Sequence, residues 1–241
     1  MLTLIGLGLH DEKDITLRGI DAAKNADKVY IELYTGKWFG SLDRLEEIVG
    51  KDIVELKRSD LEENSNRILD EAAKKDIAIF MQGDPLVITT HNSLIADARK
   101  MKIDTKVIHN ASIFSSIAET GLHVQKFGPS VAISFPEKTK GKLPESVYKT
   151  ILDNKKRGLH TLCLLDLVDG KVMEPKDALK ILQALDKEKM ISDVIVASRL
   201  GGKSKIVSGK IGDIMDVKFE EPSVVVIVGN LHFTEKEFLN I

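Results

Sequence analysis

The sequence predicts an α/β protein of two domains, with mainly parallel and mixed sheets. Short apolar, β-branched runs alternate with amphipathic helical patterns, which is typical of βαβ units. The length of 241 residues suits one large domain or two small ones. Strand spacing changes near residues 107–130, and an exposed loop, "PEKTKGKLPES", follows. We therefore expect an N-terminal domain over residues 1–111, a C-terminal domain over 112–241, and a ligand cleft between them.

The first half predicts three strands, each followed by a helix. "LTLIGLG" precedes "ITLRGIDAAKNA", "KVYIELY" precedes "SLDRLEEIVG", and "AIFMQG" precedes "TTHNSLIADARKM". Asp14 is placed to cap a helix that begins near Ile15. Strand and helix patterns in this alternation predict a largely parallel sheet.

The second half continues with four apolar runs and a clear amphipathic helix. The runs are "SVAISF", "HTLCLLDL", "DVIVASRL" and "SVVVIVG". In "EPKDALKILQALDKEK", helical periodicity brings Ala178, Ile181, Leu182 and Leu185 to one face. These patterns predict a second α/β unit.

Composition and charge exclude several classes of function. The formal net charge of −2 argues against direct binding of nucleic acid by phosphate neutralisation. No apolar run approaches a membrane-spanning length, and the opening residues lack a basic signal-peptide region. The six histidines show no metal-ligand spacing, and Cys163 lies in an apolar run, so we expect no metal site and a buried thiol. We expect a cytoplasmic protein that does not contact a membrane.

The stretch "MQGDPLVITTH" places a carboxylate, Asp84, between Gly83 and Pro85 at the end of a predicted strand. Glycine permits unusual backbone angles and proline removes an N–H, so the strand must end there. Ligands of open α/β sheets bind beyond the carboxyl ends of strands. An ordinary turn is the alternative, and the tripeptide alone favours that alternative.

The stretch "IGLGLHDEKDITLRG" places Gly6 and Gly8 at the end of the first strand. As a dinucleotide-binding motif it is deficient, because the third glycine is missing. Glu32, at the end of the second strand, could bind a ribose, whereas Asp11 would repel a pyrophosphate. A nicotinamide-dependent oxidoreductase is therefore a possible but inferior interpretation.

Two further stretches leave alternatives open. Ser112, Ser115 and Ser116 stand at the entry of a helix, where capping is as good an explanation as catalysis, and no Gly-x-Ser-x-Gly motif surrounds them. The loop "YTGKWFG" around Trp38 could be a mobile aromatic flap, but a loop anchored by aromatic packing is slightly favoured.

The opening "IGLGLHDEKDITLRGIDAAKNADKVYIE" and the later "GDPLVITTH" together resemble the tetrapyrrole methylase superfamily of S-adenosylmethionine-dependent enzymes. Within it, "HNASIFSSIAETGLHVQKFG", "RGLHTLCLLDL" and the closing "VIVGNLHFTEKEFL" resemble the diphthine synthases. The resemblance implies two α/β domains with S-adenosylmethionine in the interdomain cleft, and a homodimer. It also implies a protein substrate, translation elongation factor 2, whose 3-carboxy-3-aminopropyl-modified histidine is methylated on its amine to give diphthine.

The resemblance also implies a set of cofactor contacts. Asp84 would accept a hydrogen bond from the ribose or ammonium group. Methyl transfer from a sulfonium to an amine needs no metal and no covalent intermediate, so we expect positioning to supply most of the acceleration. We assign no catalytic residue: His160 and His232 could accept a proton or contact the substrate, but a structural role is favoured for both. The cofactor-binding positions are Leu9, Asp84, Val87, Ser112, Ile113, Leu165, Leu200 and Ser223.

A related methyltransferase that acts on a porphyrinoid or on ribosomal RNA is the nearest alternative function. The "GLHVQKFG" and "RGLHT" stretches weaken the porphyrinoid version, and the near-neutral charge weakens the RNA version. A non-catalytic nucleotide-binding module would bind the cofactor without transferring a methyl group. The loops "TGKWF" and "PEKTKGK" are candidate docking surfaces for the elongation factor.

Overall fold

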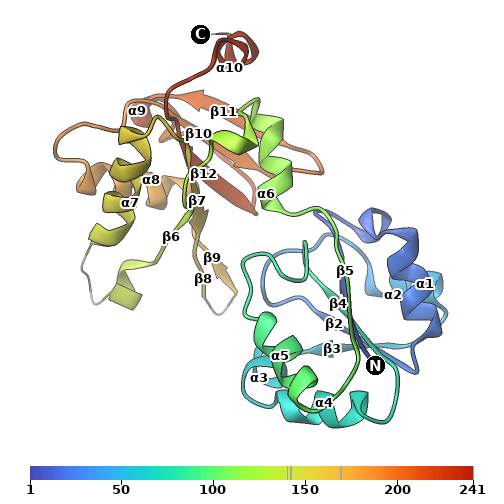
Figure 1. Ribbon diagram of the computed structural model, residues 1–241. Coiled ribbons are helices and arrows are strands. Elements are labelled where there is room, and N and C mark those ends of the chain that lie inside the picture. The colour runs from blue at the N-terminus through green and yellow to red at the C-terminus, as the bar shows by residue number, and fades with distance from the viewer. Residues whose placement is uncertain (140, 142, 169, 241) are drawn as a thin grey trace. The chain divides into compact units, whose positions relative to one another are not determined.

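The computed structural model describes residues 1–139, 141, 143–168 and 170–240 (Figure 1). The chain forms two compact units, Met1–Ser115 and Ser116–Ile241. The boundary expected from sequence, after residue 111, lies close to this division. Lys140 and Lys142 of the proposed docking loop lie outside the described residues. The predicted fold class is confirmed, because one unit holds a parallel sheet and the other a mixed sheet.

Unit 1 contains a five-stranded sheet in the order β3-β2-β4-β1-β5, in which every neighbouring pair is parallel. All residues of β1 and β4 are buried, as expected for strands covered on both faces. The loops that follow β4, β1 and β5 therefore leave the same edge of the sheet side by side. The strands are β1 (Leu2–Gly6), β2 (Lys28–Glu32), β3 (Ile53–Leu56), β4 (Ile77–Met81) and β5 (Thr105–Ile108).

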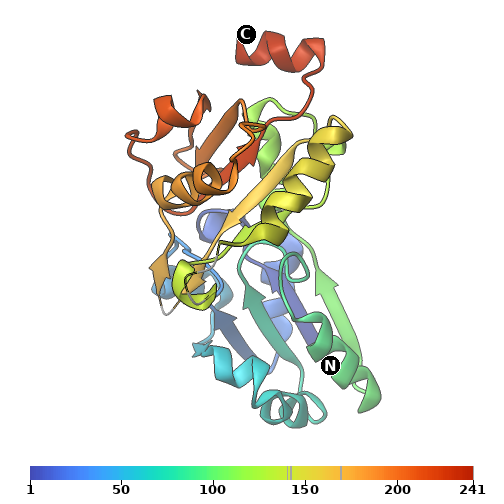
Figure 2. The same cartoon turned by 90° about the vertical axis from the view of Figure 1, so that its left-hand side faces the viewer.

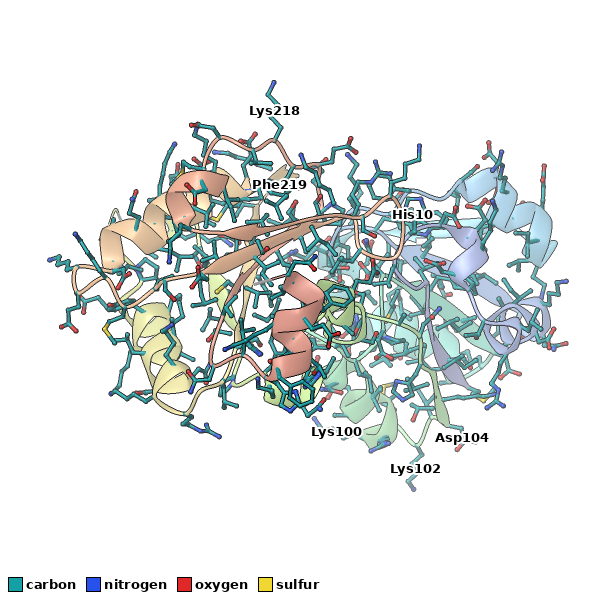
Figure 3. All side chains as sticks on the ribbon, turned by 90° about the horizontal axis from the view of Figure 1, so that it is seen from above. His10, Lys100, Lys102, Asp104, Lys218 and Phe219 are labelled. Carbon is teal, nitrogen blue, oxygen red and sulfur yellow. The ribbon has the colours of Figure 1, made fainter. Side chains whose placement is uncertain are left out.

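Helices cover both faces of this sheet. Val29 joins the apolar cluster under α1 and α2, whereas its neighbour Tyr30 joins the cluster under α3, α4 and α5, because successive strand residues point to opposite faces. Lys100 at the end of α5 and Lys102 and Asp104 in the segment after it have side chains that project outward (Figure 3). The helical elements are η1 (Glu12–Asp14), α1 (Leu17–Asn25), α2 (Leu42–Val49), α3 (Arg58–Glu62), α4 (Ser65–Ala72), α5 (Asn92–Lys100) and, at the division, α6 (Ile113–Ser116).

The prediction that Asp14 caps a helix beginning near Ile15 is wrong. Helix α1 begins at Leu17, and the hydroxyl of Thr16 accepts a hydrogen bond from the N–H of Gly19 at 3.1 Å. A threonine in extended conformation before the first helical residue is a preferred N-cap. Asp14 is therefore available to organise the preceding loop.

Unit 2 contains a five-stranded mixed sheet in the order β11-β10-β12-β7-β6. Only β6 and β7 run parallel, and the other neighbours are antiparallel. Each of the four apolar runs predicted from sequence contains one of these strands. The edge strand β11 was missed because its side chains are only partly buried and alternate weakly. The strands are β6 (Val131–Ile133), β7 (Thr161–Leu165), β10 (Val194–Ser198), β11 (Lys205–Gly209) and β12 (Ser223–Ile227), with a separate ribbon of β8 (Leu167–Val168) and β9 (Lys171–Val172).

Helices α7, α8 and α9 pack against one face of this second sheet, where they share an apolar cluster with β7, β10 and β12. The predicted face of α8 is confirmed, because Ala178, Ile181, Leu182 and Leu185 are all buried. Cys163 is fully buried, and burial raises the pKa of its thiol. The helical elements are η2 (Ile117–Thr120), η3 (Val124–Lys126), η4 (Pro136–Thr139), α7 (Glu145–Lys156), α8 (Pro175–Leu185), α9 (Ile211–Ile214) and α10 (Phe233–Leu239).

Helix α10 lies beyond the sheet of its own unit and is fastened to it by a buried carboxylate, Glu235 (Figures 1 and 2). This carboxylate accepts hydrogen bonds from the N–H groups of His123 at 2.8 Å and His232 at 2.7 Å, and from the ammonium of Lys126. Burial alone would raise the pKa of Glu235, but these donors hold that pKa at about 2. The network thus anchors α10 to the rest of unit 2.

His160 completes this network as a neutral, fully buried side chain. Its Nδ1 accepts from the N–H of Gly229 at 2.9 Å, so its Nε2 carries the proton and donates to Glu235 at 3.2 Å. Burial lowers the pKa of the His160 imidazole.

Across the described ranges, no helix combines the length and the apolar character that crossing a bilayer requires.

Candidate functional site

Three loops meet at the carboxyl edge of the unit 1 sheet: residues 7–16 after β1, residues 82–91 after β4, and residues 109–112 after β5. The first two are joined directly, because the N–H of Gly8 donates to the carbonyl of Gly83 at 3.2 Å and the N–H of Gly83 donates back at 3.0 Å. Ligands of parallel sheets bind at this edge. The two stretches singled out from sequence therefore form one candidate site.

Glycine is required at these positions by space and by backbone angle. A Cβ at Gly6 would lie 2.6 Å from the carbonyl oxygen of Gly83 and 2.7 Å from the Cβ of Asn110. Gly8 has φ +82°, and a Cβ there would lie 2.5 Å from the Cβ of Asp14. Any side chain at Gly6 or Gly8 would thus push the loops apart.

Asn110 ties the three loops together. Its side-chain amide donates to the carbonyl oxygens of Gly6 and Asp14, both at 2.9 Å, and its backbone N–H donates to the carboxylate of Asp84 at 3.2 Å. The carboxylate of Asp14 accepts from the backbone N–H groups of Leu9 and His10, earlier in the same loop, at 3.0 and 2.7 Å. The loops are therefore held by side chains as well as by their own backbone.

Asp84 is buried, with 7% of its surface exposed, and its carboxylate has three partners. Oδ1 accepts from the N–H of Leu86 at 3.0 Å, and Oδ2 accepts from Asn110 and from Nδ1 of His109, the latter at 2.8 Å. A carboxylate offers about four acceptor positions, so one remains for a ligand. Asp84 shapes its own loop and retains the capacity to bind a donor.

The other predicted cofactor positions of unit 1 lie on the same loops. Leu9 and Val87 are partly buried and follow the two linked glycines. Ser112 is buried. Its backbone N–H donates to the hydroxyl of Ser115, and that hydroxyl donates to the carbonyl of Ser112. Ile113 is the first residue of α6. The structure thus brings Leu9, Asp84, Val87, Ser112 and Ile113 to one edge of one sheet.

The remaining predicted positions gather at one edge of the unit 2 sheet. Ser223 begins β12 and pairs with Ser198 of β10, and Leu200 follows two residues later. Leu165 ends β7, which runs antiparallel to β12 and pairs Leu164 with Val224. Strand direction therefore places Leu165, Leu200 and Ser223 close to one another.

Features at the unit 1 edge fit a ligand such as S-adenosylmethionine, which carries hydroxyl, ammonium and sulfonium groups. The Oε1 atom of Gln82 and the hydroxyl of Tyr34 are buried without a hydrogen-bond partner. A Cβ at Gly83 would meet no atom nearer than 3.9 Å, at Ala111 and Ser112. A buried carboxylate and an unpaired amide oxygen at the same edge of the sheet suit a positively charged ligand that donates hydrogen bonds.

Glu32 does not offer the free carboxylate that a dinucleotide-binding enzyme would present to a ribose. It is 1% exposed, and it accepts from the hydroxyl of Thr35 at 2.9 and 3.0 Å and from the N–H of Gln82 at 3.2 Å. Burial raises its pKa to about 7 despite these donors. Glu32 therefore stabilises the turn after β2.

Several residues singled out from sequence have structural roles. His160 and His232 belong to the Glu235 network, and Trp38 packs into the apolar cluster under α1 and α2, against Gly40. This contact favours the anchored loop over the mobile flap. Within the residues that the structure describes, no group of three His, Cys, Asp or Glu side chains could hold a metal ion.

Sequence reasoning missed His109 and Asn110 at the site. Both follow β5, whose short, half-exposed pattern gave no clear strand signal. The stretch "IHNAS" offered a usable sign, because polar residues that follow an apolar run at the end of a strand are candidates for a ligand edge.

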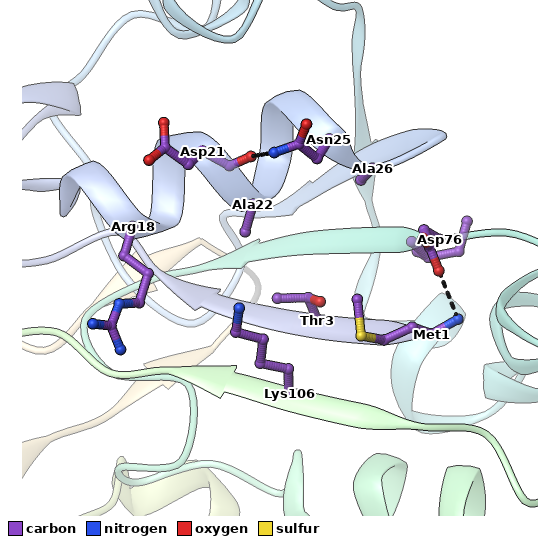
Figure 4. Close-up of a pocket in the computed structure, with 10 residues that line it drawn as sticks. Met1, Thr3, Arg18, Asp21, Ala22, Asn25, Ala26, Asp76 and Lys106 are labelled. Carbon is purple, nitrogen blue, oxygen red and sulfur yellow. Dashed lines mark hydrogen bonds and ion pairs between the residues drawn. The ribbon is translucent and has the colours of Figure 1, made fainter.

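A separate pocket of about 370 Å³ lies beside α1 in unit 1 (Figure 4). Its lining includes Thr3 on β1, Lys106 on β5, and Arg18 and Asp21 on α1. Most of these side chains are exposed, and the pocket reaches the start of β4 at Asp76. It therefore extends along the sheet toward the end opposite the three loops.

Comparisons with known proteins agree with this geometry. The sequence model of the protein family Tetrapyrrole (Corrin/Porphyrin) Methylases matches residues 1–215 of this chain. A diphthine synthase of Methanocaldococcus jannaschii is 41% identical over 252 residues, covering 99% of this chain and 97% of the relative. One of Methanococcus aeolicus is 38% identical over 250 residues, covering 99% and 96%. A crystal structure of diphthine synthase matches with a TM-score of 0.91 at 36% identity, covering 99% of this chain and 94% of that chain. The chain therefore belongs to the tetrapyrrole methylase family, and within it to the group of the diphthine synthases.

Proposed function

We propose that this chain is an S-adenosylmethionine-dependent N-methyltransferase of diphthamide biosynthesis. Its substrate is translation elongation factor 2, and the acceptor is the amine of the 3-carboxy-3-aminopropyl-modified histidine, which becomes diphthine. The observation that carries the proposal is the identity of about 40% to diphthine synthases over nearly the whole chain.

The chain's own residues would hold the cofactor at the two sheet edges. Leu9, Val87 and Ile113 offer apolar contacts, and Asp84 and Ser112 offer polar ones. Leu165, Leu200 and Ser223 would contribute from unit 2. When bound, S-adenosylmethionine supplies a methyl group activated by its sulfonium.

Positioning is the main contribution that these residues make to the reaction. Holding two reactants in the correct orientation can lower a barrier by roughly 7 to 11 kcal/mol. The loops that carry the site are linked to one another by hydrogen bonds of Asn110 and of the Gly8–Gly83 pair, which fix their relative positions. The buried carboxylate of Asp84 would favour a positively charged ligand.

The assembly and location of the enzyme are part of the same proposal. We infer a homodimer in the cytoplasm, where elongation factor 2 acts. Light scattering of the purified protein at several concentrations would measure its mass. A mass of one chain at every concentration contradicts the dimer.

The decisive experiment is mass spectrometry of elongation factor 2 that bears the unmethylated modification, after incubation with this protein and S-adenosylmethionine. We expect mass gains in methyl steps on the peptide that carries the modified histidine, and their number counts the transfers. If S-adenosylhomocysteine binds but no mass is gained, the substrate is different and a related methyltransferase activity replaces this proposal.

Thermal unfolding separates the proposal from the oxidoreductase alternative. A ligand that binds only the folded state raises the melting temperature. We expect S-adenosylhomocysteine to raise it and NAD to leave it unchanged. The reverse result would favour a nicotinamide enzyme.

A further inference from the structure

We propose that His109 accepts the proton that the acceptor amine must lose, and that Asp84 orients it for this task. The inference rests on the proposed function. It arises from a pair of side chains, since Nδ1 of His109 lies 2.8 Å from Oδ2 of Asp84.

The pair joins a buried carboxylate to an exposed imidazole. The side chain of Asp84 is 7% exposed and that of His109 is 68% exposed. An ionised carboxylate can only accept, so Nδ1 of His109 carries the ring proton and Nε2 is left with a free lone pair. No hydrogen bond to Nε2 occurs among the described residues. The geometry therefore fixes a tautomer whose basic nitrogen faces outward.

His109 also stands where the reaction is expected. It is the first residue after β5, beside the loop that carries Asp84 and next to Asn110, which links all three loops of the site. Carboxyl ends of parallel strands form the ligand edge of such sheets. The two histidines considered earlier, His160 and His232, belong instead to the Glu235 network of unit 2.

Several other ionisable groups of this edge have structural roles, and the ring of His10 stacks on that of Phe39. Asp14 holds the backbone of its own loop, and Glu32 holds the turn after β2. His91 is buried, its Nδ1 contacts the carbonyl of Pro85, and burial lowers its pKa. Among these groups, His109 alone combines exposure with a carboxylate partner.

The proton step balances without a further reactant. The acceptor enters as an ammonium, and an N–H bond breaks with its electron pair left on nitrogen as the nucleophile. The proton joins the lone pair of Nε2 of His109, and the resulting imidazolium, stabilised by Asp84, later releases it to water. Each methyl transfer to an amine releases one proton, so the step recurs with every transfer.

The substitution His109→Asn separates proton acceptance from positioning. The Asn side-chain amide can replace Nδ1–H as a donor to Asp84, but it has no counterpart of Nε2. We expect S-adenosylhomocysteine affinity within about twofold of the wild type. We expect the single-turnover methylation rate to fall roughly 10- to 100-fold at pH 7, within the usual range of acid–base catalysis. The deficit should shrink at pH 10, where the amine is neutral without help.

A measurement on the ligand-free protein tests the tautomer independently of activity. Nitrogen-15 NMR should show neutral His109 protonated at Nδ1, and the Asp84→Ala variant, which has no acceptor at this position, should lose this preference. A wild-type ring protonated at Nε2, or a His109→Asn rate equal to wild type at every pH, overturns the inference. If the wild-type protein itself transfers no methyl group to the modified factor, the proposed function fails, which is a different outcome from an active enzyme that does not need His109.

Discussion

The side-chain amide of Asn110 lies 2.9 Å from the carbonyl oxygen of Gly6, a residue more than a hundred positions earlier in the chain. A second hydrogen bond of equal length reaches Asp14. Removing this amide leaves two carbonyl groups without their donor. We expect Asn110→Ala to lower the free energy of unfolding by about 2 kcal/mol and to weaken S-adenosylhomocysteine binding. Urea denaturation and calorimetry would measure the two effects.

Asn25→Ala is the matched control, because the amide of Asn25 makes one exposed hydrogen bond within α1. Its effect on unfolding should stay within about 0.5 kcal/mol. Equal losses in the two variants would contradict the linking role of Asn110.

The closeness of the first two loops predicts the effect of Gly6→Ala. The new Cβ would lie 2.6 Å from the Gly83 carbonyl, so the backbone must shift, and we expect a loss of about 3 kcal/mol together with loss of cofactor binding. Gly212→Ala in α9 meets no atom within 4 Å and should leave stability unchanged or slightly raised. Thermal melts with and without S-adenosylhomocysteine would compare them. A Gly6→Ala protein that binds normally would show that these loops tolerate separation.

Asp84→Ala should weaken S-adenosylhomocysteine binding at least tenfold. It should also lower stability by about 1 to 3 kcal/mol, because the N–H groups of Leu86 and Asn110 lose their acceptor. Isothermal titration calorimetry on the folded variant gives the affinity. Unchanged affinity would remove Asp84 from the cofactor site and leave it a structural residue.

Glu235→Gln should destabilise unit 2 by about 3 kcal/mol, since the neutral amide cannot balance Lys126 or accept from as many donors. Glu237→Gln, on the exposed side of the same helix, should have no measurable effect. Proteolysis near the C-terminus would report release of α10. Resistance equal to wild type in both variants would mean that other contacts hold the helix.

Because His160 is buried, we expect the free energy of unfolding to fall in mild acid. Because burial lowers the folded-state pKa of His160, the unfolded chain binds the proton more readily. The contribution of neutral His160 to the free energy of unfolding is therefore complete above its ordinary pKa of 6.5, and it declines as the pH falls below that value. Urea unfolding between pH 7.5 and 5.5 should show a smaller decline for His160→Gln than for wild type. Since buried His91 contributes in the same direction, only the difference between the two proteins is diagnostic.

Sequence patterns predicted where strands and helices occur better than whether neighbouring strands run parallel or antiparallel. The alternation of strands and helices up to residue 108 indicated the parallel sheet of unit 1. In unit 2, the short connection from β10 to β11 leaves no room for a crossover helix, and these strands run antiparallel. The apolar runs themselves carry no information about direction, because a buried strand has the same composition either way.

Some residues of the candidate site could be predicted from the sequence and others could not. Gly8 and Asp84 were found because glycine and proline mark loops at strand ends. Asn110 and His109 were missed because their importance comes from partners far away in the sequence, such as Gly6 and Asp84. Local patterns cannot report such contacts.

The strand order of unit 1 also constrains how the chain folds. Strand β1 pairs with β4 and β5 and not with β2. The backbone of β1 can therefore form its sheet hydrogen bonds only after the segments around Ile77 and Thr105 have been synthesised. Closing loops of this length costs entropy before any contact compensates for it, and parallel pairing of distant strands is slow. During synthesis on the ribosome, the apolar segment "LTLIG" must therefore remain unpaired until most of unit 1 has been made. The three loops of the site can assemble only after that event, so the ability to bind a ligand arises late in folding.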